Sequence, residues 1–180
     1  MKNKYVIYSC VANRTDGTKL VRIIKIQAHF NVEDLAIALI TASDSSNELK
    51  NTQIEYDGNS YYFDYEDKIC DGINFNELEN KNIKITLNYK DGKKLEYNCD
   101  EVGEEITNKP ITRTTPFLLS LMGVSRLTYE EYNRIHASKE NDIRTLISMN
   151  DYYVEECKEE NKILKDFQRF FNLNKETFYM

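Results

Sequence analysis

The chain has 180 residues, 24 of them basic and 30 acidic, which gives a formal net charge of −6. This length suits one domain with a substantial core, and the acidic balance disfavours a general nucleic-acid-binding protein. No apolar run approaches the roughly 18 residues of a transmembrane helix, and the amino terminus lacks the apolar run of a signal peptide. We therefore expect a cytoplasmic protein that does not contact a membrane.

The first part of the chain is typical of a sheet built from hairpins. Alternating apolar and polar residues, the pattern of a half-buried strand, recur in short segments separated by turn residues. Several of these turns carry an Asp-Gly pair, because glycine accepts the positive φ that a tight turn needs. The expected strands cover residues 4–12, 20–27, 53–56, 60–65, 83–90 and 94–99.

The clearest hairpin lies within residues 81–105. Ile83, Ile85 and Leu87 are expected on a buried face, and Lys84 on the opposite, solvated face. Asp91-Gly92 supplies the turn. This hairpin is therefore predicted to form the centre of the sheet.

One helix is expected between the second and third strands. Asn31 can cap its amino terminus, and Glu33 and Asp34 fall in its first turn, where the helix dipole favours acidic side chains. Its apolar residues recur at helical spacing and are Val32, Leu35, Ala36 and Leu39. We expect this helix to end in the polar run at 43–48.

The last third of the chain predicts helices. Thr115 can cap a short apolar helix with Pro116 at its first position and Gly123 at its end. Residues 128–131 fit a capping box, and the last helix is expected over 151–171. Its apolar stripe is expected to comprise Tyr153, Cys157, Leu164, Phe167 and Phe171. The fold class is therefore α+β, with a sheet domain at 1–127 and a helical extension at 128–180 packed on it.

Few residues are suited to catalysis. The two histidines, His29 and His136, have no nucleophile motif near them, and the four cysteines form no Cys-x-x-Cys pair, so we expect free thiols in a reduced compartment. No nucleotide-binding fingerprint is present, so no cofactor is expected. The acids Asp64, Asp67 and Asp71 could hold a divalent cation, although their spacing does not fit an EF-hand loop.

Tyrosines and acids are concentrated in the middle of the chain. Residues 55–79 hold eight acids against Lys68 alone. Aromatic residues occupy both faces of the strand at 60–65, and tyrosine supplies large amphipathic contact area. The other face of this strand is either a contact surface or is covered by the carboxy-terminal helices. The residues of the candidate binding surface are Tyr61, Tyr62, Asp64, Tyr65, Glu66, Asp67 and Asp71.

The order of elements resembles the plasmid pRiA4b ORF-3-like family over residues 4–135. The strand and helix in LVRIIKIQAHFNVEDL keep the family's arginine as Arg22, with Val21 in place of its tryptophan. In YKDGKKL the family's signature hairpin keeps only Tyr89 and Gly92, because its two acids and its tryptophan are replaced. The resemblance implies the fold and an origin on a mobile element, and the lost acids put the family's activity in doubt here.

Three functions are compatible with these observations. The first is a non-enzymatic macromolecule-binding protein that uses the acidic, tyrosine-rich surface to bind a basic or nucleic-acid-binding protein. The second is a metal-dependent hydrolase that uses the carboxylates of residues 64–71. The third is nucleic-acid binding through the amino-terminal hairpin, where residues 1–25 hold six basic side chains.

Overall fold

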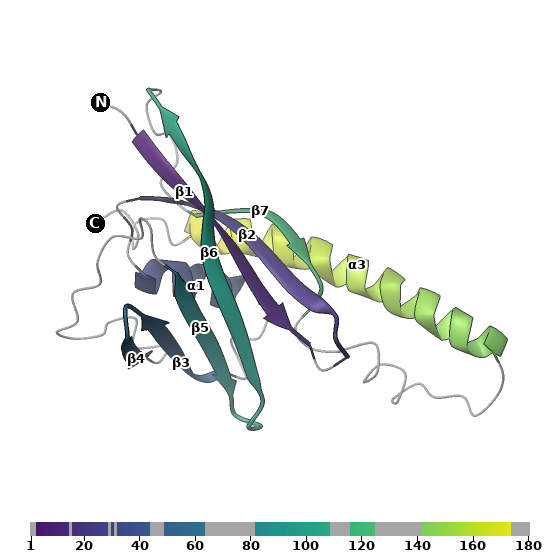
Figure 1. Cartoon of the computed structure of the whole chain (residues 1–180). Helices are drawn as coiled ribbons and strands as arrows, with labels where there is room; N and C mark the ends of the chain where they lie inside the picture. Colours follow the sequence, from purple (N-terminus) through teal and green to yellow (C-terminus); the bar gives the residue numbers. More distant parts are fainter. Residues whose placement is uncertain are drawn as a thin grey trace.

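The computed structural model describes residues 3–14, 16–28, 30, 32–43, 49–63, 82–108, 116–124 and 142–173. These residues form an antiparallel sheet with two helices (Figure 1). The strands are β1 (Asn3–Asn13), β2 (Lys19–Gln27), β3 (Leu49–Tyr56), β4 (Asn59–Phe63), β5 (Ile83–Tyr89), β6 (Lys94–Thr107) and β7 (Phe117–Met122). The helices are α1 (Val32–Thr41) and α3 (Asp142–Leu173).

The seven strands lie in the order β4-β3-β5-β6-β1-β2-β7. Three pairs of consecutive strands form antiparallel hairpins: β1–β2, β3–β4 and β5–β6. Their tight turns need positive φ, and Gly92 adopts 87° between β5 and β6. The turn between β3 and β4 has positive φ at both Asp57 (50°) and Gly58 (77°), which matches the right-handed twist of a hairpin. The predicted α+β class is confirmed.

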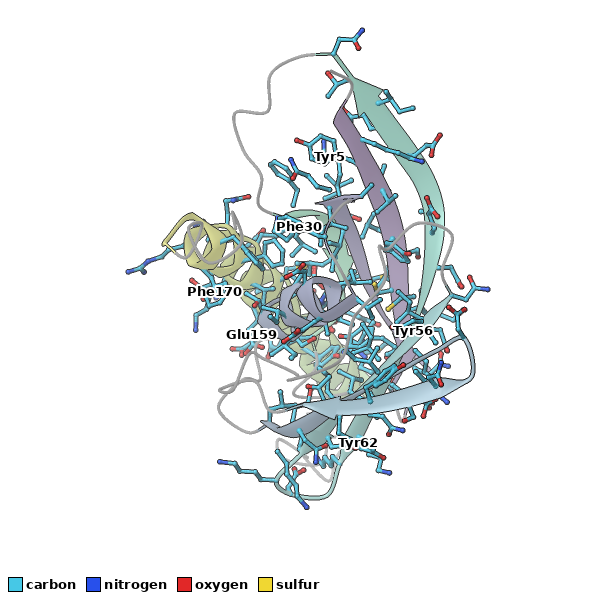
Figure 2. The ribbon with its side chains drawn as sticks, turned by 90° about the vertical axis from the view of Figure 1, so that its left-hand side faces the viewer. Tyr5, Phe30, Tyr56, Tyr62, Glu159 and Phe170 are labelled. Atoms are coloured by element: carbon cyan, nitrogen blue, oxygen red, sulfur yellow. The ribbon has the colours of Figure 1, made fainter. Side chains whose placement is uncertain are left out.

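The two helices lie on one face of the sheet, which curves around α1 (Figure 2). We call this the inner face and the opposite one the outer face. α1 is buried on nearly every side because it contacts β2, β3, β5 and α3 at once. The predicted faces of the central hairpin are confirmed: Ile83, Ile85 and Leu87 are buried, and Lys84 is half-exposed.

The prediction of a short apolar helix that begins at Pro116 is wrong. Residues Phe117–Met122 form strand β7, which pairs with β2. A short apolar run is compatible with either structure, and here the unpaired edge of β2 supplies backbone partners that an isolated helical turn would lack. Gly123 ends the strand with a φ of 82°.

The predicted stripe on the last helix is only partly right. Phe167 and Phe171 are buried, but Tyr153, Cys157 and Leu164 face solvent. The buried face is instead made by Tyr152, Ile163, Phe167 and Phe171, with Glu156 between them. The stripe was misplaced because a buried glutamate on the inward face breaks the apolar pattern that a sequence shows. The capping box at 128–131 lies outside the described residues.

Candidate binding surface

The outer face of the sheet changes character from one half to the other. Strand register places one row of outward side chains across all seven strands. In order, these residues are Ser60, Glu55, Lys84, Asn98, Val11, Val21 and Met122. We call the outer face of β4, β3, β5 and the part of β6 that pairs with β5 the polar half. The outer face of β1, β2 and β7 is the apolar half.

The side chains of the polar half bond to one another. Lys84 forms an ion pair with Glu96 and lies 3.9 Å from a carboxylate oxygen of Glu55. Gln53 donates hydrogen bonds to Glu55 (2.6 Å) and to the Ser60 hydroxyl (2.9 Å). Charges on this half are therefore largely balanced within the sheet, as expected for a solvated face.

The apolar half carries aliphatic side chains at positions where an exposed strand normally has polar ones. Ile7, Val11, Val21 and Ile23 are partly exposed, and Met122 is 51% exposed. Both helices that the structure describes lie on the other face (Figure 2), so no described helix or strand covers these residues. An apolar face of this kind is typical of an interaction site.

One end of the apolar half is closed by a cation between two aromatic rings. The Lys25 ammonium lies 5.1 Å from the ring centres of both Tyr5 and Phe117. It also donates a hydrogen bond of 3.1 Å to Glu105. These contacts fix the long Lys25 side chain over the rings and mark a polar border to the aliphatic surface.

The structure describes two residues of the predicted acidic, tyrosine-rich surface, Tyr61 and Tyr62. Tyr62 is 60% exposed on the outer face, at the sheet edge remote from α3 (Figure 2). Tyr61 points to the inner face and packs on Tyr56, with ring centres 5.6 Å apart. The two described helices thus do not cover the outward face of β4. The remaining predicted residues, Asp64, Tyr65, Glu66, Asp67 and Asp71, lie outside the described part of the chain.

The three residues matched to the family hairpin and strand serve the fold. Arg22 is completely buried and donates to the carbonyl oxygens of Ala42 (2.8 Å), Val21 (3.0 Å) and Met122 (3.1 Å). Its charge thus lies at the carboxyl end of α1, where the helix dipole favours a cation. Tyr89 and Gly92 form the β5–β6 turn through a 3.0 Å backbone hydrogen bond.

Three basic residues of the amino-terminal hairpin are paired with acids. Lys4 and Lys25 form ion pairs with Glu104 (3.0 Å) and Glu105 (3.1 Å), and Arg14 pairs with Glu156 at 2.6 Å. Part of the positive charge of this hairpin is therefore balanced by acids of the same chain.

The pair of Arg14 and Glu156 fastens α3 to the sheet and was not predicted from the sequence. Both side chains are largely buried, and Glu156 also accepts hydrogen bonds from the Tyr152 hydroxyl and the Val124 amide, each 3.1 Å long. Burial lowers the pKa of Arg14, but the hydrogen bond and charge of Glu156 outweigh it, so the net shift is upward. The Arg14 guanidinium therefore stays charged at physiological pH. No local sequence pattern could reveal it, because the partners lie far apart in the chain.

The candidate catalytic residues predicted from the sequence, both histidines and the acids of residues 64–71, lie outside the described part of the chain. Within the described part, no three His, Cys, Asp or Glu side chains are placed to hold a metal ion. Cys10 and Cys99 are buried free thiols opposite each other in β1 and β6, and burial raises the pKa of Cys99 well above its ordinary value. Such a thiol is a poor nucleophile.

A groove of about 540 Å³ opens at one end of the polar half, beside the β3–β4 turn. It exists because β5 begins at Ile83, opposite Cys99, while β6 continues to Thr107. Beyond this step β6 pairs with β1 but with no other strand of the described residues. The polar lining comprises Glu55, Asn59, Ser60, Asn82, Lys84, Asn98 and Asp100, and the rest of the lining is Tyr56, Gly58, Ile83 and Cys99.

No protein-family model matches this chain, and no curated protein matches it either. A crystal structure of a protein of unknown function from Methanosarcina mazei Go1 is similar, with a TM-score of 0.54 and 15% identity. The match covers 78% of this chain and 85% of that one. At this identity the likeness concerns the fold alone. The pRiA4b ORF-3-like resemblance stays a prediction. Among the described residues, no helix is both long and apolar enough to cross a membrane.

Proposed function

We propose that this chain is a non-enzymatic macromolecule-binding protein that recognises a protein partner with the outer face of its sheet. The observation that carries the proposal is the row of aliphatic side chains in the apolar half. Strands of a two-layer domain normally alternate between apolar inner and polar outer residues. Val11, Val21 and Met122 depart from this alternation on three neighbouring strands, and a contiguous exposed apolar patch is typical of an interaction site.

Tyr62 extends this surface toward the opposite edge of the sheet. It is a large aromatic residue on the same outer face, and exposed tyrosines are enriched in protein interfaces. The acid-rich segment begins one residue after β4 ends. A partner that reaches Tyr62 therefore meets negative charge, which favours a basic protein and accelerates association at low salt.

The test is affinity capture from the native host, followed by reconstitution with the purified captured protein. Val21→Thr keeps the shape of the side chain but removes its apolar character, and Tyr62→Ala removes the aromatic ring. Tyr153→Ala is the matched control because Tyr153 is 52% exposed on α3, away from the outer face.

We expect the wild type and Tyr153→Ala to bind the purified partner equally, and both outer-face variants to bind it more weakly. Equal binding by all four proteins would refute the proposal, as would a loss confined to Tyr153→Ala.

A further inference from the structure

The groove beside the β3–β4 turn has the chemistry of a pocket for a cationic side chain. Its lining is rich in hydrogen-bond acceptors, with two carboxylates and three side-chain amides against one ammonium. An arginine head group has five donors and no acceptor, so it matches such a lining. The volume of about 540 Å³ falls within the usual range for ligand pockets.

The two carboxylates of the lining are not equivalent. Glu55 accepts a hydrogen bond from Gln53 and lies near Lys84, whose charge is further balanced by Glu96. Asp100 has no hydrogen bond or ion pair with any described residue. It lies on the outer face of β6, two residues from Asn98. Asp100 is thus the carboxylate of this groove that is available to a ligand.

Ile83, Cys99 and Tyr56 also line the groove, where their side chains are at most 6% exposed. The apolar surface open to a ligand is therefore narrow and could contact only part of an arginine stem. An arginine buries its aliphatic stem against apolar surface while its charged head contacts acceptors at the rim. A free metal ion would gain nothing from this surface, and an anion would be repelled by Asp100 and Glu55.

We propose that this groove binds an arginine side chain of the partner protein, with Asp100 as its counter-ion and Asn98 and Asn82 as further acceptors. The inference rests on the proposed function and names the partner's chemistry at this end of the surface. It also places one basic contact of the partner on residues that the structure describes, independently of the acids at 64–71.

The probe is the peptide acetyl-Gly-Arg-Gly-amide, titrated into isotope-labelled protein and followed by amide chemical shifts. The neutral isostere acetyl-Gly-citrulline-Gly-amide tests the role of charge. Asp100→Asn removes the counter-ion, and Asp91→Asn is its matched control, because Asp91 lies in the turn of the same hairpin at the other end of the strands. The asparagine of this control keeps the oxygen that accepts the Lys93 amide proton.

We expect saturable shifts at Lys84, Asn98 and Asp100 with the arginine peptide, and about fivefold weaker binding by Asp100→Asn, as for an exposed ion pair. Asp91→Asn should bind like the wild type, and added salt should weaken binding. Equal binding of the citrulline peptide, no shifts in the groove, or unchanged affinity in Asp100→Asn would each overturn the inference. If the captured partner still binds Asp100→Asn at wild-type affinity, the proposed function survives without this groove.

Discussion

Along the strands, apolar residues are expected on the inner face of the sheet and polar residues on the outer face. Each face carries exceptions to this pattern, and the two kinds of exception differ. On the helical side the departures are polar: Arg22 is buried among carbonyl oxygens, and Glu156 is buried against Arg14. On the outer face the departures are apolar: Val11, Val21 and Met122 stand where polar residues are expected. Both of these buried polar side chains have hydrogen-bond partners inside the molecule, although Arg22 Nη2 has none among the described residues. The exposed apolar ones have none among the described elements, which is why we look for theirs in another molecule.

The buried ion pair gives the largest expected effect. Glu156→Ala would leave the Arg14 guanidinium largely buried without its counter-ion, and should lower the free energy of unfolding by about 3–5 kcal/mol. Urea denaturation measures this loss. Tyr152→Phe is the smaller control, since it removes one hydrogen-bond donor to Glu156 and should cost about 1 kcal/mol. Equal, small losses would mean that α3 is held by its phenylalanines and not by the ion pair.

The next largest loss of stability is expected in the β5–β6 hairpin, where buried and exposed side chains alternate regularly. Leu87→Ala creates a cavity on the inner face and should cost about 2–5 kcal/mol. Lys84→Ala, on the outer face of the same strand, should cost less than about 0.5 kcal/mol. Both values come from chemical denaturation. Similar losses from the two variants would contradict the assignment of faces.

Glu33, on α1, is another polar exception on the helical side, and no cation among the described residues forms an ion pair with it. Burial, followed by the nearby charge of Asp34, raises its pKa from 4.5 to about 7. The ionised form is therefore penalised in the folded state. The penalty is absent below the unfolded pKa, grows as pH rises toward 7, and is complete above it. The side chain is half-buried, so screening reduces its size.

Glu33→Gln should accordingly raise the free energy of unfolding by about 1 kcal/mol at alkaline pH and give no gain in acid. Urea denaturation at pH values above and below the window from 4.5 to about 7 tests this. A gain of the same size at both pH values would show that the effect does not come from ionisation of Glu33.

The smallest effect on stability is expected where the effect on binding is largest. Val21→Thr keeps a β-branched side chain on the outer face, so unfolding should change by less than about 0.5 kcal/mol. Binding of the purified partner should nevertheless weaken, because the hydroxyl must be desolvated in the interface. If Val21→Thr instead destabilised the fold strongly, the residue would belong to the core of this chain.

Much of the fold follows from local patterns, and the exceptions have physical causes. The three hairpins and α1 were predicted because alternation, Asp-Gly turns and helical spacing are all local signals. β7 was not predicted because the short apolar run Phe117–Met122 is compatible with either a helix or a strand. Pairing with the edge of β2, which the sequence does not reveal, makes it a strand. The inward face of α3 was misplaced because Glu156 is paired with Arg14, 142 residues away.

Only Tyr62 of the proposed binding surface was predicted from the sequence. Its predicted acids lie outside the described residues, and the apolar half could not be found from single strands. Strand β2 has aliphatic residues at both its odd and its even positions, so both of its faces carry them. The sequence KLVRIIKIQ alone therefore does not show which face of β2 is exposed. Only the position of both helices on the inner face makes Val21 and Ile23 outward residues.

The most direct test of the central claim is hydroxyl-radical footprinting of the free protein and of its complex with the captured partner. Tyr62 and Met122 lie at opposite edges of the outer face, and Tyr153 lies on α3 with comparable exposure. We predict that complex formation lowers the oxidation of Tyr62 and Met122 and leaves Tyr153 unchanged. Protection of Tyr153, with Tyr62 and Met122 oxidised as in the free protein, would contradict the assignment of the outer face as the binding surface.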